Sequence, residues 1–253
     1  MVRGGSRPYP RRGDGFEIAE LRAYVEGDDP RRIDWAATAR AGALQTRVLL
    51  EEHALWFGAV LDDSASLNVG RKRALRLAAY EALDAWADAL GTQDRAARIF
   101  AAAVEAPHLF GARAASRLRE RQPIMPFDLT AALRLARFAL PKDAALLVIS
   151  DFYGTLDDDL VRELGAWLDV TALVARDPWS DGLPLRGFVR VRDAESGAAQ
   201  TLFLGRRSAR RYVAAVRRRH EDLHARLTAS GWRTGSFDEG DGSAALHAAF
   251  GIA

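Results

Sequence analysis

Short apolar runs alternate with longer amphipathic stretches through the middle of the chain. The apolar runs occupy residues 54–61, 95–104, 144–150 and 169–175. Apolar residues recur at helical spacing in residues 70–90, 128–140 and 156–168. A parallel sheet requires such an alternation, because its strands are buried on both faces and each crossover between them needs a long connection, usually a helix. The sequence therefore predicts an α/β fold with a mostly parallel central sheet between helices.

The two ends of the chain differ from this central pattern. Residues 1–15 are rich in Gly, Pro and Arg, which predicts a flexible basic arm. Residues 16–52 combine turn formers and charges with a strand-like run at 44–52, which predicts an irregular N-terminal segment packed on the core. The remaining domain, residues 53–253, is predicted to include a C-terminal extension. This extension consists of a hairpin at 187–205, a helix at 207–230, a strand at 232–237 and a short helix at 243–251.

The composition is that of a folded soluble protein. Of the 253 residues, 49% are hydrophobic and 28% are charged, and the formal net charge is only +2. Cysteine is absent from the sequence, which excludes disulfides and thiol chemistry. The apolar runs are too short to span a bilayer, and the basic N-terminus lacks the apolar stretch of a signal peptide. We therefore expect a cytoplasmic protein.

Two of the predicted strands end at an aspartate, Asp62 and Asp151. The carboxyl ends of parallel strands lie at one edge of a sheet, so the two carboxylates can meet there. Ser64 and Ser66 follow Asp62 at alternate positions and add two hydroxyl oxygens. Such an all-oxygen set suits a hard cation such as Mg²⁺ or Mn²⁺. Asp and Ser also cap helices and form turns, so local capping is the alternative role of this stretch.

The D-x-S-x-S pattern after a buried strand, with a later strand-terminal aspartate, resembles the metal-ion-dependent adhesion site of von Willebrand factor A domains. The stretch YVEGDDPRRIDWAATARAGALQTRVLLEEHALWFGAVLDDSASL is more specifically similar to the bacterial domain-of-unknown-function family 58. SDF at 150–152, ARDPWSDGLP and VRDAESG fit the later part of that family, so the similarity runs from about residue 13 to the C-terminus.

The resemblance implies a von Willebrand factor A-like (Rossmann-like) core, and it implies no catalytic reaction. It also implies that the chain acts with a MoxR-type AAA+ ATPase, as an adaptor or chaperone-like partner. Another von Willebrand factor A-like protein is the second partner that the resemblance suggests. The expected metal ligands carried over from the adhesion site are Asp62, Ser64, Ser66 and Asp151.

The third metal-binding loop departs from the family pattern. The family resembles G-G-T-D-L-x-x-A-L there, whereas this chain reads MPFDLTAAL. Aligning Asp128 puts Phe127 where the threonine ligand belongs, and Thr130 is out of register. An aromatic ring cannot coordinate a hard cation, so the site loses one ligand and gains an apolar wall. Phe127 and Asp128 are therefore expected to contact a partner beside the four remaining ligands.

An upstream cluster of charges and one aromatic residue has two possible roles. Its members are Asp28, Asp29, Arg31, Arg32, Asp34 and Trp35. As an interaction surface, the cluster would offer arginines to carboxylates and Trp35 as an aromatic anchor. As a structural loop, it would be ion-paired and would pin the N-terminal segment to the domain, with Trp35 in the core. Alternating charge beside proline favours the structural loop.

An H-E-x-x-H motif suggests an enzymatic alternative. His220, Glu221 and His224 have the spacing that places two imidazoles and a general base at the zinc of a metalloprotease. His220, however, continues an apolar stripe from Val213 and Val216, and a third ligand is not evident in the sequence. A magnesium-dependent hydrolase using the two strand-terminal aspartates is a related possibility. Neither is the expected function.

Clustered arginines suggest nucleic-acid binding as a further alternative. They are Arg11, Arg12, Arg206, Arg207, Arg210, Arg211 and the run at 217–219. Acidic residues elsewhere balance their charge, and few aromatic residues are interleaved with them. A protein partner is therefore expected in preference to nucleic acid.

Overall fold

The computed structural model describes residues 12–50, 56–62, 64–89, 96–100, 108–109 and 127–252. The chain divides into two compact units, Met1–Ala54 and Leu55–Ala253. The boundary predicted between residues 52 and 53 lies close to this division. Residues 1–11 of the predicted arm fall outside the described residues.

An antiparallel pair of strands forms the first unit. Strand β1 (Arg12–Ala23) pairs with β2 (Gln45–Leu50), and a 3-10 helix η1 (Pro30–Arg32) and helix α1 (Trp35–Ala41) lie between them in sequence. Residues 12–15 of the predicted arm belong to β1, where Arg12 and Glu17 both pair with Leu50 and the stretch between them is an irregularity of the ladder. The segment predicted to be irregular is likewise ordered. Tertiary pairing thus overrides the turn-forming composition.

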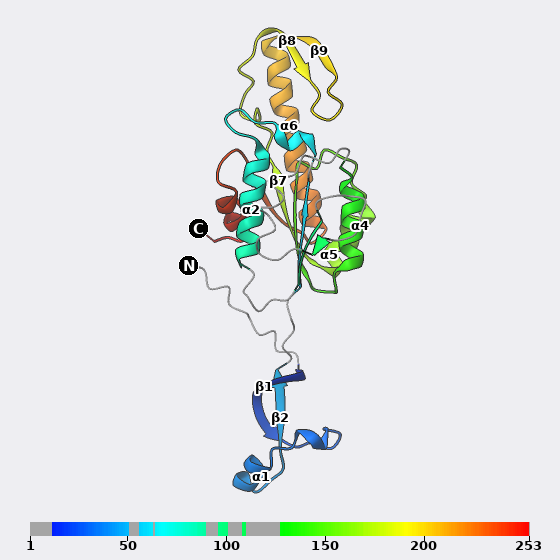
Figure 1. Cartoon of the computed structure of the whole chain (residues 1–253), viewed down its shortest axis with the longest axis vertical. Coiled ribbons are helices and arrows are strands. Elements are labelled where there is room, and N and C mark those ends of the chain that lie inside the picture. The colour runs from blue at the N-terminus through cyan, green and yellow to red at the C-terminus, as the bar shows by residue number, and fades with distance from the viewer. Residues whose placement is uncertain are drawn as a thin grey trace. The chain divides into compact units, whose positions relative to one another are not determined.

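A six-stranded sheet forms the centre of the second unit (Figure 1). Its strands are β3 (Trp56–Leu61), β4 (Ala96–Phe100), β5 (His108–Leu109), β6 (Ala145–Ser150), β7 (Asp169–Ala175) and β10 (Arg233–Phe237). The spatial order is β10-β7-β6-β3-β4-β5, and all neighbours are parallel except β4 and β5. The predicted mixed α/β fold with a mostly parallel sheet is confirmed. The short antiparallel β5 was not predicted.

Two hydrophobic clusters cover the two faces of this sheet. On one face, α2 (Leu75–Ala89) and α7 (Gly242–Ala249) pack against alternate strand residues such as Leu61 and Leu147. On the other face, α4 (Leu129–Ala139) and α5 (Asp158–Trp167) pack against the residues in between, such as Val60 and Val148. Burial of both faces explains the continuous apolar runs of the sequence, because neither side of a central strand meets water.

A hairpin and a long helix extend from the second unit. Strands β8 (Gly187–Arg192) and β9 (Ala199–Leu204) form an antiparallel hairpin, followed by α6 (Arg206–Ala229). Leu223 and Leu227, near the C-terminal end of α6, belong to the core cluster that also contains α4 and α5. The N-terminal half of α6 continues beyond the sheet beside the hairpin (Figure 1). The predicted hairpin-helix extension is confirmed.

Element boundaries differ modestly from those expected. Helix α2 begins at Leu75, although helical spacing was expected from residue 70. The strand expected at 95–104 is described only over Ala96–Phe100. Among the helices in the described ranges, none combines the length and the apolar character that crossing a bilayer requires.

Candidate functional site

The two strand-terminal aspartates lie at the same edge of the sheet. Asp62 directly follows β3 and Asp151 directly follows β6, and these strands are adjacent and parallel. The Asp62 backbone N–H donates to the Ile149 carbonyl at 2.9 Å, which continues the ladder to the end of both strands. The fold therefore brings together two carboxylates separated by almost ninety positions in the sequence (from 62 to 151). We call the loops that follow β3 and β6 the strand-edge loops.

The Asp62 carboxylate is buried and held by hydrogen bonds on both oxygens. Its residue is 5% exposed. The Ser150 hydroxyl donates to Oδ2 at 2.6 Å, and the Ser64 backbone N–H donates to Oδ1 at 2.9 Å. Burial raises the pKa of Asp62, and the negative charge of Asp151 adds to this effect, while the hydrogen bonds from Ser150 and Ser64 oppose it. A nearby cation would offset the cost of keeping this carboxylate ionised.

The two serines after Asp62 direct their hydroxyls toward each other. The Ser64 and Ser66 Oγ atoms are 2.7 Å apart, and Ser64 is buried. A short 3-10 helix η2 (Ala65–Asn68) begins immediately after Ser64, yet the Ser64 side chain makes no capping hydrogen bond. The capping alternative therefore does not account for the Ser64 hydroxyl. Asp62, in contrast, does form a local turn through the Ser64 amide.

A carboxylate from the β8–β9 hairpin reaches the first strand-edge loop. The Ser66 backbone N–H donates to Glu195 Oε1 at 3.0 Å, although the two residues are 129 positions apart. Glu195 lies in the turn of the hairpin, where Asp193 accepts hydrogen bonds from the Ser196 backbone and side chain. Sequence reasoning missed this contact. The only signal was an acidic residue in the AESG turn.

The second strand-edge loop has an unusual backbone and a contact from α6. Phe152 is buried at φ 53°, a left-handed conformation that is rare for a bulky residue. The Asp151 carboxylate accepts from the Tyr153 backbone N–H at 2.9 Å. The Arg219 guanidinium lies 3.6 Å from the Tyr153 ring centroid and donates to the Phe152 carbonyl. Helix α6 thus fixes the loop that carries Asp151, a role of Arg219 that was not predicted.

The third predicted metal-binding loop, at residues 127–130, does not direct its hydroxyl toward the two strand-edge loops. Phe127 is half-buried and packs against the hydrophobic core, and Asp128 caps α4 by accepting from the Ala131 backbone N–H at 3.0 Å. The Thr130 hydroxyl donates to the Thr155 carbonyl at 2.8 Å. These contacts give Phe127 and Asp128 structural roles, and partner contact by either residue stays a prediction.

The upstream cluster is ion-paired but leaves its tryptophan exposed. Arg22 makes two hydrogen bonds to Asp28, at 2.8 and 2.7 Å. Asp34 caps α1 and also accepts from Arg47 at 3.0 Å, so its pKa is lowered, first by the Ala37 amide and then by Arg47. Trp35 is 68% exposed.

The placement of Trp35 in the core is therefore wrong. The reason is local: Trp35 is the first residue of α1, and the buried residue of this helix is Ala37. Asp29 caps η1 through the Arg31 amide. The loop is thus ordered by its acids, while an interaction role for Trp35, Arg31 and Arg32 stays a prediction.

The H-E-x-x-H histidines bind a serine of the sheet. His220 Nε2 and His224 Nε2 lie 2.8 and 3.1 Å from the Ser236 hydroxyl of β10, and their ring centroids are 4.4 Å apart. Burial, then the positive surroundings, lower the pKa of His220 to about 4, and burial lowers the pKa of His224. Both imidazoles are therefore neutral at pH 7 and are used in packing α6 onto the sheet.

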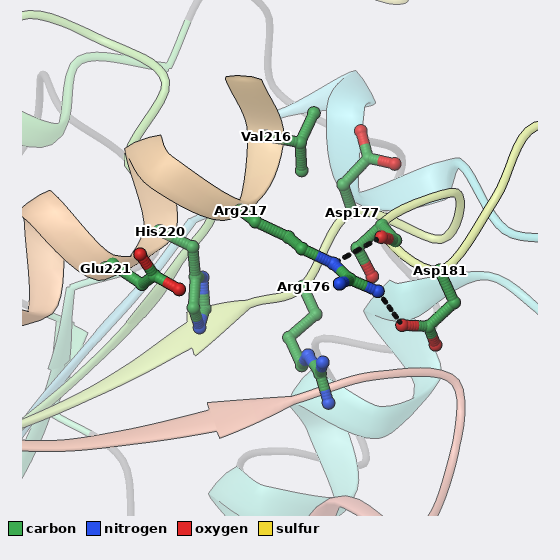
Figure 2. Close-up of a pocket in the computed structure, with 8 residues that line it drawn as sticks. Arg176, Asp177, Asp181, Val216, Arg217, His220 and Glu221 are labelled. Atoms are coloured by element: carbon green, nitrogen blue, oxygen red, sulfur yellow. Dashed lines mark hydrogen bonds and ion pairs between the residues drawn. The ribbon is translucent and has the colours of Figure 1, made fainter. Parts of the chain in front are cut away.

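Glu221 lines a small pocket together with His220. The pocket has a volume of about 170 Å³, and Figure 2 shows Glu221 and His220 on one side of it and Arg217 and Asp181 on the other. Arg217 donates to the Ser180 carbonyl at 3.1 Å and to Asp181 at 3.4 Å. In the described part of the chain, no group of three or more His, Cys, Asp and Glu residues is arranged to hold a metal ion.

Comparisons with known proteins place the chain in a family and show what its fold is similar to. Residues 20–222 match the family described as "Protein of unknown function DUF58". The uncharacterized proteins Rv1480 of Mycobacterium tuberculosis and Mb1516 of Mycobacterium bovis are 32% identical over 202 residues. That alignment covers 74% of this chain and 63% of each relative, so the chain spans less than two thirds of their length.

Two solved structures are similar in fold. They are the conserved hypothetical protein BatB from Bacteroides thetaiotaomicron and an aerotolerance-related membrane protein from Bacteroides fragilis. The sequence identities are 17% and 15%, the TM-score is 0.50 for each, and each similarity covers 78% of this chain and 97% of the other. At these identities the likeness concerns the fold alone.

Proposed function

The chain belongs to the family of proteins of unknown function DUF58, and from this premise we propose that it is a non-enzymatic protein-interaction module. Its strand-edge loops bind a carboxylate of a partner protein. The partner is a MoxR-type AAA+ ATPase, for which the chain serves as an adaptor or chaperone-like partner in the cytoplasm. The core is of the von Willebrand factor A type, a proposal supported by the mostly parallel sheet and by the D-x-S-x-S loop at its carboxyl edge.

The contact between Glu195 and Ser66 is the observation that carries this proposal. A carboxylate already lies on the first strand-edge loop, bound at 3.0 Å by the Ser66 amide. The carboxylate comes from an exposed hairpin turn and not from the core, so a partner's Asp or Glu can replace it without disturbing packing. Glu195 thus acts as an internal stand-in for the partner's acidic residue.

The donor atoms at the strand-edge loops fit a hard divalent cation. Asp62 and Asp151 contribute carboxylates, and Ser64 and Ser66 contribute hydroxyls that already converge on each other. These oxygens match the preference of Mg²⁺ and Mn²⁺, and a bound ion would need water in place of the family threonine, because Phe127 has no donor atom. When bound, the ion would supply a positive charge that bridges the loops to a partner's carboxylate. The raised pKa of buried Asp62 agrees with a site that a cation stabilises.

Binding to the purified cognate MoxR-type ATPase tests the proposal. Calorimetry or biolayer interferometry with Mg²⁺ present should give a dissociation constant for the wild-type chain. The Asp62→Ala/Asp151→Ala variant should weaken binding by at least about tenfold, since it removes both carboxylates of the site. Asp62→Asn, which keeps the side-chain shape, provides a second variant if the double variant does not fold.

Two further variants separate the site from general charge effects. Asp159→Ala/Asp169→Ala makes the same change in charge at exposed positions of α5 and β7, and it should bind as the wild type does. Glu195→Ala should bind more tightly, because the partner no longer competes with an internal carboxylate. If the strand-edge variants keep wild-type affinity, these loops are not the binding site.

A further inference from the structure

Two phenylalanines are exposed together on the β8–β9 hairpin. Phe188 is 81% exposed and Phe203 is 65% exposed. They are cross-strand partners, and their rings meet edge to face with centroids 5.3 Å apart. Leu185, which is 48% exposed, precedes Phe188 by three residues. Large apolar side chains that are exposed side by side are unfavourable in water, and such patches often mark a surface that another molecule covers.

The alternation of β8 shows that this exposure is built into the strand. Val189 and Val191 are half-buried, whereas Phe188, Arg190 and Arg192 are exposed. Residues at alternate positions of a strand share a face, so the outer face of the hairpin combines an aromatic pair with two guanidinium groups. The aromatic side chain of Phe188 therefore lies on the exposed face of β8, while the smaller valines occupy the half-buried face.

The neighbouring start of α6 adds positive charge. Arg206, Arg207, Arg210 and Arg211 are exposed, and they begin three residues after Phe203. Residues 185–211 contain seven arginines and two acidic residues. Both acids are engaged at the far turn of the hairpin, where Glu195 binds Ser66 and Asp193 binds Ser196. As far as the structure describes the chain, these four arginines and those of β8 form no ion pair with its acids.

We propose that the β8–β9 hairpin and the N-terminal half of α6 form a docking surface for an anionic membrane. The arginines bind lipid phosphates, and the Phe188–Phe203 pair enters the boundary between headgroups and acyl chains. This combination of basic and large apolar side chains is what interfacial membrane binding requires. The surface, defined by Phe188, Phe203, Arg190, Arg192, Arg206, Arg207, Arg210 and Arg211, is called the hairpin surface below.

The side chains favour lipid over single-stranded nucleic acid, the other polyanion with apolar faces. Base stacking needs free ring faces, and the edge-to-face contact between Phe188 and Phe203 covers one face of the pair. Leu185, which is also exposed, has no ring for stacking, but its transfer from water into hydrocarbon is favourable.

The hairpin surface and the strand-edge loops are separate, so this inference does not depend on the proposed function. The Phe188–Phe203 pair lies at the open end of the hairpin, next to the start of α6, whereas Glu195 lies at the turn. Four ladder pairs, from Val189–Leu202 to Arg192–Ala199, lie between the Phe188–Phe203 pair and the turn that carries Glu195. Figure 1 shows the hairpin running along the projecting half of α6. A membrane at the open end leaves the strand-edge loops accessible.

Vesicle co-sedimentation of the full chain tests the proposal. Vesicles containing phosphatidylglycerol should bind the chain, vesicles of phosphatidylcholine alone should not, and added salt should weaken binding. Phe188→Ser/Phe203→Ser and Arg206→Gln/Arg207→Gln should each reduce the partition coefficient by about tenfold or more. All of these side chains are exposed, so both variants should keep the wild-type circular dichroism spectrum and thermal midpoint.

Matched controls distinguish the surface from exposed residues in general. Phe138→Ser removes an 89% exposed phenylalanine of α4, and Arg162→Gln/Arg218→Gln removes two exposed arginines outside the hairpin surface. These variants should partition as the wild type does. Failure of the wild-type chain to bind phosphatidylglycerol vesicles overturns the proposal. Tight binding of a single-stranded oligonucleotide that requires the same residues, without vesicle binding, would assign the surface to nucleic acid instead.

Discussion

The polar groups of the strand-edge loops are buried and bound to one another, whereas those of the hairpin surface are exposed to solvent. At the strand-edge loops, charged and hydroxyl groups are buried and bound to one another, as Asp62 is by Ser150 and Ser64. On the hairpin surface, arginines and aromatic rings face outward, and no acid of the described residues pairs with those arginines. Glu195, in the turn of the same hairpin, accepts a hydrogen bond from the Ser66 amide of the first strand-edge loop.

This difference teaches that a buried polar site and an exposed one constrain the chain differently. The buried site is part of the packing of β3 and β6, so changes there alter stability and binding together. The exposed surface contributes little to folding, so changes there should alter binding alone.

Truncation of a core leucine beside the buried site should have the largest effect. Leu61 is 1% exposed and directly precedes Asp62, so Leu61→Ala should lower the free energy of unfolding by about 2–5 kcal/mol, through lost burial and the cavity that remains. Leu202 is 39% exposed on the hairpin, and Leu202→Ala should cost less than about 1 kcal/mol. Urea denaturation measures both. Equal losses would contradict the contrast between the two regions.

The pH dependence of stability should report the burial of Asp62. Because the pKa of Asp62 is raised in the folded state, the folded chain holds this proton more tightly than the unfolded chain does. The wild-type chain should therefore lose stability, relative to Asp62→Asn, as the pH rises from the usual range of carboxylates through the raised pKa. Denaturation curves at a series of pH values without divalent ions test this. A constant difference between the two proteins would show that Asp62 is not titrating in a buried site.

Acidification should reveal the role of His220 in anchoring α6. The pKa of His220 falls from 6.5 to about 4 in the folded state, so the unfolded chain takes up the proton first. Stability due to the neutral imidazole is fully present above pH 6.5 and is lost progressively as the pH falls toward about 4. His220→Gln should therefore show a shallower loss over this interval in thermal denaturation. An unchanged slope would mean that the histidine is not buried neutral against Ser236.

Removal of the link between the two regions should have the smallest effect on stability. Glu195→Ala deletes one exposed hydrogen-bond acceptor and should lower the free energy of unfolding by no more than about 1 kcal/mol. The Ser66 amide should nevertheless exchange with solvent several-fold faster, because its acceptor is lost. Glu221→Ala, an exposed glutamate on α6, is the control and should leave that amide unchanged. If the Ser66 amide stays protected in Glu195→Ala, the hydrogen bond between Glu195 and Ser66 does not form in solution.

The sequence predicted the buried region well because burial leaves a regular pattern. Continuous apolar runs marked β3 and β6, and each run stops at its aspartate, so the meeting of Asp62 and Asp151 followed from parallel pairing. The departure at Phe127 was also readable from the motif. Its consequence was not, because the half-buried packing of Phe127 and the capping role of Asp128 depend on tertiary contacts.

Long-range and surface features were not predictable in the same way. The Glu195–Ser66 contact joins positions 129 apart, and its turn sequence is ordinary. Trp35 was placed in the core as part of the structural-loop interpretation, yet α1 buries Ala37 instead. The exposure of Phe188 and Phe203 required the register of β8 and β9, which periodicity alone does not supply.

Hydrogen–deuterium exchange with and without the MoxR-type ATPase tests the central claim most directly. If a partner carboxylate replaces Glu195 on the first strand-edge loop, residues 64–69 should become more protected while residues 193–197 of the hairpin turn become less protected. Protection confined to other surfaces, with both of these segments unchanged in the complex, would contradict it.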